Sequence, residues 1–149
     1  MTNTHELLCR GTELALPGAS LAMLMDAQEE LRRMPQAEPG PLLHLFMPGV
    51  YARTIILREG ICVAGKMHGQ DHICIVAGDC SVMTEEGATR YTGYHIFNTR
   101  KGTKRIVYAH ADSYITTIHR TDKTDLADIE REVMLQDPYV VVDSPEVSP

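Results

Sequence analysis

The chain has no excess of positive charge and no long apolar run. Its 149 residues include 14 Lys and Arg against 20 Asp and Glu, which gives a formal net charge of −6 at pH 7. A general nucleic-acid binder needs clustered Lys and Arg to neutralise phosphates, so nucleic acid is not an expected partner. Every apolar run falls well short of the ~20 residues that a membrane-spanning helix needs. A membrane is therefore not an expected partner either.

The sequence also lacks the pattern of a signal peptide and the cysteine spacing of a zinc-thiolate site. Residues 1–6 lack the basic-then-apolar pattern of a signal peptide. The four cysteines, at positions 9, 62, 74 and 80, show no CxxC spacing. This favours small buried thiols in a reducing compartment over disulfides or zinc thiolates. The sequence also holds no nucleophile elbow, phosphate loop or dinucleotide fingerprint. We expect a cytoplasmic protein that is not secreted through a signal peptide.

The sequence does contain a series of short strands. From Val50 to His119, apolar and β-branched runs alternate with turn residues at intervals of 8–12 residues or less. This spacing is typical of an all-β sandwich or barrel and not of alternating strands and helices. The Gly78-Asp79 pair is predicted to turn the chain between two strands. The predicted strands cover residues 51–57, 61–64, 73–77, 80–84, 88–91, 95–97, 105–110 and 114–119.

Helical extensions are predicted on both sides of a single barrel. Residues 1–41 form an N-terminal arm, with a helix over about residues 20–34, capped by Ser20, and a Pro-rich linker. Residues 42–120 form the barrel. Residues 121–149 hold a second helix capped by Thr124 or Asp125, a strand-like segment at 139–142 and a loose tail at 144–149. These extensions either cap their own domain or clamp neighbouring protomers.

One segment concentrates groups that bind metals or move protons. His68, Asp71 and His72 lie close together, directly before a β-type run, and His119 ends a later predicted strand. A mononuclear metal site needs three or four such ligands. Adjacent strand residues point to opposite faces, so only one of Asp71 and His72 is expected to face the interior. The alternative is that the imidazoles are strand-edge polar groups without a metal. Further candidate ligands are His95 and His110.

The same segment resembles the first sequence motif of the cupins, which runs from a Gly through His-x-His and Glu to a second Gly. Here His68 lies in the His region, Lys66 stands at the position of its partner His, and Asp71 replaces the Glu, six residues before Gly78. The resemblance implies a single jelly-roll barrel. It also implies that the metal ligand set is incomplete.

The second cupin motif has its likeness in residues 100–105. Gly102 is kept, Arg105 stands where the family has a metal-binding His, and Ala109 takes the Asn position. No cofactor is therefore expected, and the alternative is a single transition metal, Fe, Mn, Ni or Zn. Most of this basic segment is predicted to be a solvated turn. Arg105 and Lys104 are nevertheless candidates for binding an anion.

A non-metal acid–base site is a further alternative. Epimerases with this barrel use a His beside a carboxylate, which fixes the imidazole tautomer and raises its basicity. His68 with Asp71, or His119 with Asp112, would be the corresponding pair. The acid would be a tyrosine from the opposite wall, chosen from Tyr91, Tyr94, Tyr108 and Tyr114.

The chain also resembles small cupin-like proteins of tailed bacteriophages. The likeness lies in residues 48–53, 65–68, 102–105 and 116–126. It implies a non-catalytic structural or binding module, a homo-oligomer, with capsid or tail proteins as partners. It places the protein in the host cytoplasm or in a virion. The alternative function is a metal-dependent cupin enzyme that acts on a small molecule.

Overall fold

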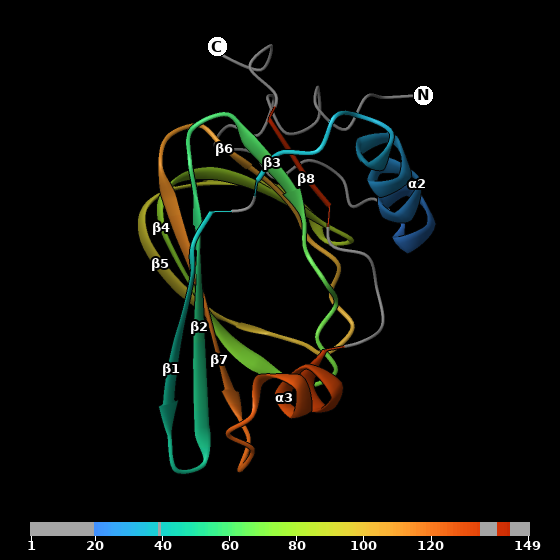
Figure 1. Ribbon diagram of the computed structural model, residues 1–149. Helices are drawn as coiled ribbons and strands as arrows, with labels where there is room; N and C mark the ends of the chain where they lie inside the picture. Colours follow the sequence, from blue (N-terminus) through green and yellow to red (C-terminus); the bar gives the residue numbers. More distant parts are fainter. Residues whose placement is uncertain (1–19, 39, 135–139, 144–149) are drawn as a thin grey trace.

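The computed structural model describes residues 20–38, 40–134 and 140–143, so the expectations for residues 1–18, for Tyr139 and for the tail at 144–149 lie outside it. The described chain folds into one eight-stranded sheet with two helices (Figure 1). The elements are α2 (Leu21–Arg32), β1 (Leu42–Met47), β2 (Val50–Leu57), β3 (Ile61–Ala64), β4 (His72–Thr84), β5 (Gly87–Thr99), β6 (Ile106–Ala109), β7 (Ser113–Arg120), α3 (Leu126–Val133) and β8 (Val140–Asp143).

The strands follow the order β1-β2-β7-β4-β6-β3-β8, and β5 pairs with β4 beside this path. The named strands pair antiparallel throughout. Figure 1 shows the sheet curling into a half-barrel, with β1 and β2 in front of the curved β4–β5 hairpin. The prediction of an all-β jelly roll with two helices is confirmed.

The expected turn at Gly78 is wrong. β4 runs through this position, and β5 likewise runs through Gly93, so four predicted strands form one long hairpin. Gly78 pairs with Gly93, and both have positive φ values, 133° and 81°. Paired glycines let the two strands bend together without losing their pairing, because neither position carries a Cβ.

Helix α2 covers the outer face of one half of the sheet. Ser20 caps it, since its Oγ accepts a hydrogen bond of 3.2 Å from the backbone N of Met23. Of the two alternatives for the N-terminal helix, packing on its own domain is confirmed by a cluster of buried residues that joins α2 to β3, β6 and β8. The members of this cluster include Leu24, Ala27, Leu31, Cys62, Ile106, Tyr108, Val140 and Val142.

Helix α3 closes one end of the curled sheet. Asp125 caps it through a hydrogen bond of 3.1 Å from the backbone N of Asp128 to its Oδ1. Ile129 and Val133 are buried against Tyr51 of β2. Figure 1 shows α3 below the open end of the half-barrel, and Glu130 of this helix lies 2.8 Å from Arg53 of β2.

The inner face of the sheet holds a second apolar cluster, which includes Cys74 and Cys80. Cys74 and Cys80 are buried and free, which confirms the predicted buried thiols at these two positions, and Cys62 is buried as well. Neither helix within the described ranges has the length and apolar character needed to cross a membrane.

Replacing Gly78 with Ala should destabilise the protein, because a Cβ there would lie 2.5–2.8 Å from atoms of Asp112 and Ser113. We expect Gly78→Ala to lower the free energy of unfolding by about 2–4 kcal/mol, from backbone strain and overpacking together. Urea unfolding measures the loss. Gly65→Ala is the matched control, since a Cβ at Gly65 meets nothing within 4 Å. Equal stability of the two variants would contradict the proposed role of Gly78.

Candidate metal centre

Three imidazoles meet at one end of the inner face, and the sheet register brings two of them together. His72 is the first residue of β4, and His119 is the last but one of β7. The pairing of Ile73 with Ile118 makes His72 and His119 cross-strand neighbours. Both are buried, with 7% and 1% of their surface exposed. Because side chains alternate along a strand, both rings lie on the inner face.

His68 comes from the loop between β3 and β4. Two backbone hydrogen bonds hold this loop in place. The N of Gly69 donates to the O of Val133 at the end of α3, at 2.6 Å, and the N of Gly102 donates to the O of His68, at 2.8 Å. The helix and the β5–β6 loop thus fix the loop from both sides, and the ring of His68 is set over the other two.

The three rings are in direct contact. Their centroids lie 4.3–4.7 Å apart, and His68 Nδ1 shares a hydrogen bond of 2.7 Å with His119 Nε2. One potential ligand nitrogen from each ring can be chosen so that all lie within 4.8 Å of one another. Two metal–nitrogen bonds of 2.0–2.1 Å span up to about 4 Å, so the cluster is close to the dimensions of a metal centre.

The hydrogen bonding leaves ring nitrogens available for a ligand. His72 Nδ1 lies 3.0 Å from the carbonyl O of Gln70, which can only accept, so Nδ1 carries the proton and Nε2 carries the lone pair. His72 Nε2 and His119 Nδ1 are both buried with no hydrogen-bond partner among the described residues. A backbone carbonyl that fixes the tautomer of a ligating imidazole is a usual feature of metal sites. These residues therefore fit a metal ion.

Burial keeps the three imidazoles neutral. Desolvation and the neighbouring rings of His72 and His119 lower the pKa of His68 to about 2. Desolvation and His72 lower the pKa of His119 to about 3. Desolvation also lowers the pKa of His72, although its hydrogen bond to Gln70 acts in the opposite direction. At neutral pH the cluster is thus in the deprotonated form that binds metals.

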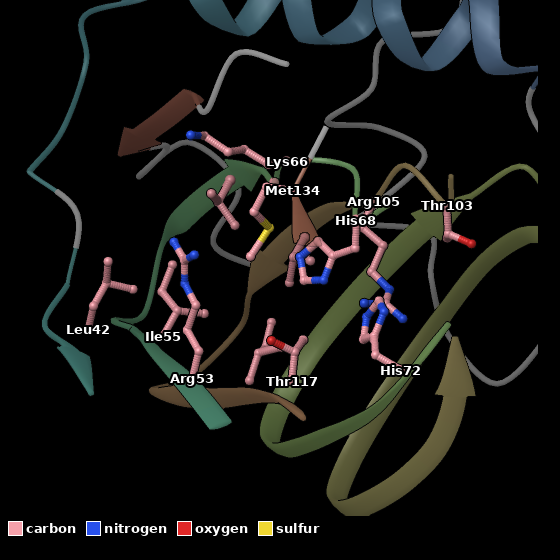
Figure 2. Close-up of a pocket in the computed structure, with 14 residues that line it drawn as sticks. Leu42, Arg53, Ile55, Lys66, His68, His72, Thr103, Arg105, Thr117 and Met134 are labelled. Atoms are coloured by element: carbon pink, nitrogen blue, oxygen red, sulfur yellow. The ribbon is translucent and has the colours of Figure 1, made fainter. Parts of the chain in front are cut away.

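Two arginines flank the cluster in a small cavity of about 90 Å³ (Figure 2). Arg105 lies beside His68 and His72 in Figure 2, donates a hydrogen bond to Thr99 Oγ1, and has its guanidinium 5.5 Å from the ring centre of Phe97. Arg53 lies 2.8 Å from a carboxylate oxygen of Glu130 on α3. The remaining lining is mostly apolar and includes Leu42, Ile55, Val63, Val107, Ile115 and Met134.

Of the four predicted metal ligands, the structure brings three together and leaves Asp71 out. Asp71 is exposed, and its Oδ1 accepts a hydrogen bond of 2.8 Å from the backbone N of Lys101. His72 faces the interior, so the preceding residue points away from it.

The two predicted anion-binding residues also separate. Arg105 lines the cavity, whereas Lys104 does not appear in its lining. The expectation of a solvated turn is wrong for Lys104, which is fully buried and donates a hydrogen bond of 2.7 Å from Nζ to the O of Gly65. Its aliphatic chain is packed in the interior and its ammonium group donates to a backbone carbonyl, so Lys104 has a structural partner within the fold.

The other candidates lie outside the cluster. His95 Nε2 contacts the O of Thr92 at 2.8 Å, and His110 Nε2 shares a hydrogen bond of 2.7 Å with Ser81. The carboxylate of Asp112 accepts from the backbone N of Glu59 at 2.9 Å. Neither of the proposed His–carboxylate pairs is among the hydrogen bonds of His68 and His119, so the acid–base alternative gains no support.

Sequence reasoning missed two residues that shape the site. Gln70 binds the backbone of Arg120 with both ends of its amide, at 3.1 and 3.2 Å, and so ties the His68 loop to β7. Arg53 could have been found from alternation, because it shares the inner face of β2 with Tyr51 and Ile55. Nothing in the local sequence marks Gln70, since its partner lies 50 residues away.

The metal-free protein should lose stability as the pH falls. The ordinary His pKa is 6.5 and the folded values are lower, so below about pH 6.5 the unfolded chain binds protons that the folded chain does not. Between about pH 7.5 and pH 5.5 we expect a loss of about 2–4 kcal/mol, measured by urea unfolding with a chelator present. The loss should be smaller in His119→Gln. An equal loss in this variant would contradict the assignment.

No protein-family model and no curated protein matches the chain. Solved structures do. Ectoine synthase from P. lautus aligns with a TM-score of 0.51 at 10% identity, over 85% of this chain and 90% of that chain. KdgF from Halomonas sp. aligns at 0.46 and 17% identity, over 63% and 91% of the two chains. A cupin-2 domain protein from Shewanella frigidimarina aligns at 0.44 and 15% identity, over 62% and 89%.

Identities this low speak for the fold alone. The curled antiparallel sheet and the match to ectoine synthase along most of both chains agree with the jelly roll expected from residues 65–78. This chain has the cupin fold, the double-stranded β-helix.

Proposed function

We propose that this protein is a metal-dependent cupin that acts on a small anionic molecule. One divalent transition metal ion is held by His68, His72 and His119. The observation that carries the proposal is the pair of buried nitrogens, His72 Nε2 and His119 Nδ1, that have no hydrogen-bond partner among the described residues. Unpaired buried polar atoms are costly, and a metal ion between the rings would satisfy them.

The donor set suits a reactive site better than a purely structural one. Three imidazoles converge, and no carboxylate of the described chain joins them. Structural zinc sites are closed by four protein ligands, whereas catalytic sites keep a position open for a small molecule. A bound ion would supply Lewis acidity to a ligand oxygen placed there. At neutral pH each imidazole is neutral, so one nitrogen keeps its N–H and the other offers a lone pair without first losing a proton.

Arg105 supports the anionic character of the ligand. Its guanidinium lines the cavity beside the imidazoles and also lines a larger cavity of about 600 Å³ with Tyr91, Phe97 and Thr99. Ligand pockets usually measure about 300–1,000 Å³. We assign the small cavity to an anionic head group and the larger one to the rest of the ligand. A planar guanidinium can bind a carboxylate through two parallel hydrogen bonds.

The convergence of the imidazoles reverses the preference drawn from the sequence. Lys66 and Arg105 at two expected ligand positions favoured a non-catalytic module with no cofactor, and that expectation is not confirmed. His119 supplies the third imidazole from β7, and His72 supplies another beside His68. A virion-associated structural role, with capsid or tail proteins as partners, stays a prediction that rests on resemblance alone.

The protein should bind one divalent metal ion per chain. We expect stoichiometric uptake of Zn²⁺, Mn²⁺, Ni²⁺ or Fe²⁺ by protein purified without a His-tag and stripped with chelator, as measured by elemental analysis. Replacing His72 or His119 with Ala removes one of three ligands and should weaken binding by at least about a hundredfold. His95→Ala is the matched control, because His95 lies outside the cluster.

This proposal fails if the stripped wild-type protein binds none of these ions. It also fails if His72→Ala, His119→Ala and His95→Ala bind them equally well. Circular dichroism of the metal-free variants separates lost ligands from lost folding.

Replacing Arg105 should weaken anion binding without removing the metal. We expect Arg105→Gln to raise the dissociation constant of acetate and of inorganic phosphate about tenfold to a hundredfold in the metal-loaded protein, since a charge-assisted hydrogen bond is lost. Calorimetric titration measures both constants. Arg58→Gln is the control, because Arg58 is exposed and lines neither cavity. Equal affinities in the two variants would remove Arg105 from the site.

A further inference from the structure

The outer face of one half of the sheet is apolar across five adjacent strands. In the register of β1, β2, β7, β4 and β5, the outward side chains form rows that run across the sheet. These rows are Ile56–Tyr114–Ala77–Tyr94, Leu43–Thr54–Thr116–Ile75–Ile96, Leu45–Ala52–Ile118–Ile73–Asn98 and Met47–Val50–Arg120. Arg120, at the border, is the single charged residue in them.

Large side chains of this face stand in solvent. The exposed fraction is 66% for Leu45 and for Met47, 65% for Tyr94 and 57% for Ile96. An antiparallel sheet with one solvated face normally shows polar residues there. The outward side chains of these strands are instead mostly apolar, as they are where a sheet face is covered.

The other half of the sheet shows how such a face is covered. There α2 lays Leu24, Ala27 and Leu31 over β3, β6 and β8. Figure 1 shows α2 on that side of the molecule and no helix over β1, β2 and β5. Within the described residues, the two halves therefore differ, because one outer face is buried by the chain itself and the other is not.

We infer that this face, which we call the outer apolar face, packs against the same face of a second copy of the chain. Only Arg120, at its border, is charged, so two copies of the face can meet without bringing charges of the same sign together at its centre. Two such sheets would stack about 10 Å apart with their strands nearly aligned. A two-fold axis through the face would close the assembly as a dimer.

The size of the face suits a stable dimer. Five strands about 4.8 Å apart and about 20 Å long cover roughly 500 Å² in flat projection. Monomers rarely expose apolar patches larger than a few hundred Å². Because the side chains project from the sheet, the solvent-accessible area of the face is larger than its flat projection and approaches the ~800 Å² per partner of a standard interface.

This inference is independent of the metal centre. The imidazoles lie on the inner face of the same strands, so a partner on the outer apolar face leaves the cavity open. A failure of metal binding and a failure of dimerisation are thus separate results. The terminal extensions, which sequence reasoning considered as protomer clamps, are not needed for this contact, because α2 and β8 pack on their own sheet.

The test is the mass of the full chain in solution. We expect wild-type protein to sediment and scatter light as a dimer. Leu45→Lys on β1 and Ile96→Lys on β5 each place a charge in the interface, and each should raise the dimer dissociation constant at least about a hundredfold. Met23→Lys is the matched control, because Met23 is 55% exposed on α2, away from the face.

Unchanged metal uptake and thermal unfolding at matched monomer concentration show that each variant is folded. A wild-type protein that stays monomeric up to its solubility limit overturns the inference. So do folded Leu45→Lys and Ile96→Lys variants that both dimerise with wild-type affinity, because the contact would then lie on another surface.

Discussion

The register between β4 and β7 is the constraint on which the site depends. Pairing Ile73 with Ile118 sets His72 against His119 on the inner face. A slip of β7 by one residue against β4 would put His119 on the outer face and leave His72 on the inner face, because strand side chains alternate with a period of two. The loop that carries His68 completes the cluster. The N of Gly69 donates to Val133, the N of Gly102 donates to His68, and the amide of Gln70 binds the backbone of Arg120.

The same alternation places two different sets of side chains on the two faces of the sheet. Inward residues of β2, β4 and β7 supply two of the three imidazoles, Arg53 and part of the apolar cavity lining. Outward residues of the same strands form the outer apolar face. One set of strands can therefore hold a reactive centre and an assembly surface without mixing them, and changes on one face need not disturb the other. Helix α2 is what makes the two halves of the sheet unequal.

Desolvation gives the centre its chemical character. Burial penalises the charged form, and a proton on one ring would repel a proton on its neighbours, so the pKa values of His68 and His119 fall to about 2 and 3. At neutral pH the three imidazoles are therefore neutral, and each has a nitrogen lone pair. The imidazoles carry no positive charge, whereas the guanidinium of Arg105 beside them does. In the proposed function, an anion and a metal cation would occupy neighbouring positions in this cavity of about 90 Å³.

The sequence by itself determined the strand periodicity, the Ser20 cap of α2 and the residue types of the centre, and it narrowed the cap of α3 to Thr124 or Asp125, because these follow from local spacing and side-chain chemistry. It also indicated that Asp71 and His72 face opposite ways, though not which faces inward. The tertiary structure alone decided that, as well as the unbroken β4–β5 hairpin and the burial of Lys104. In each case the deciding partner is distant in sequence: His119 for His72, Gly93 for Gly78, Gly65 for Lys104. Local patterns fix which groups are available, and long-range pairing fixes which of them meet.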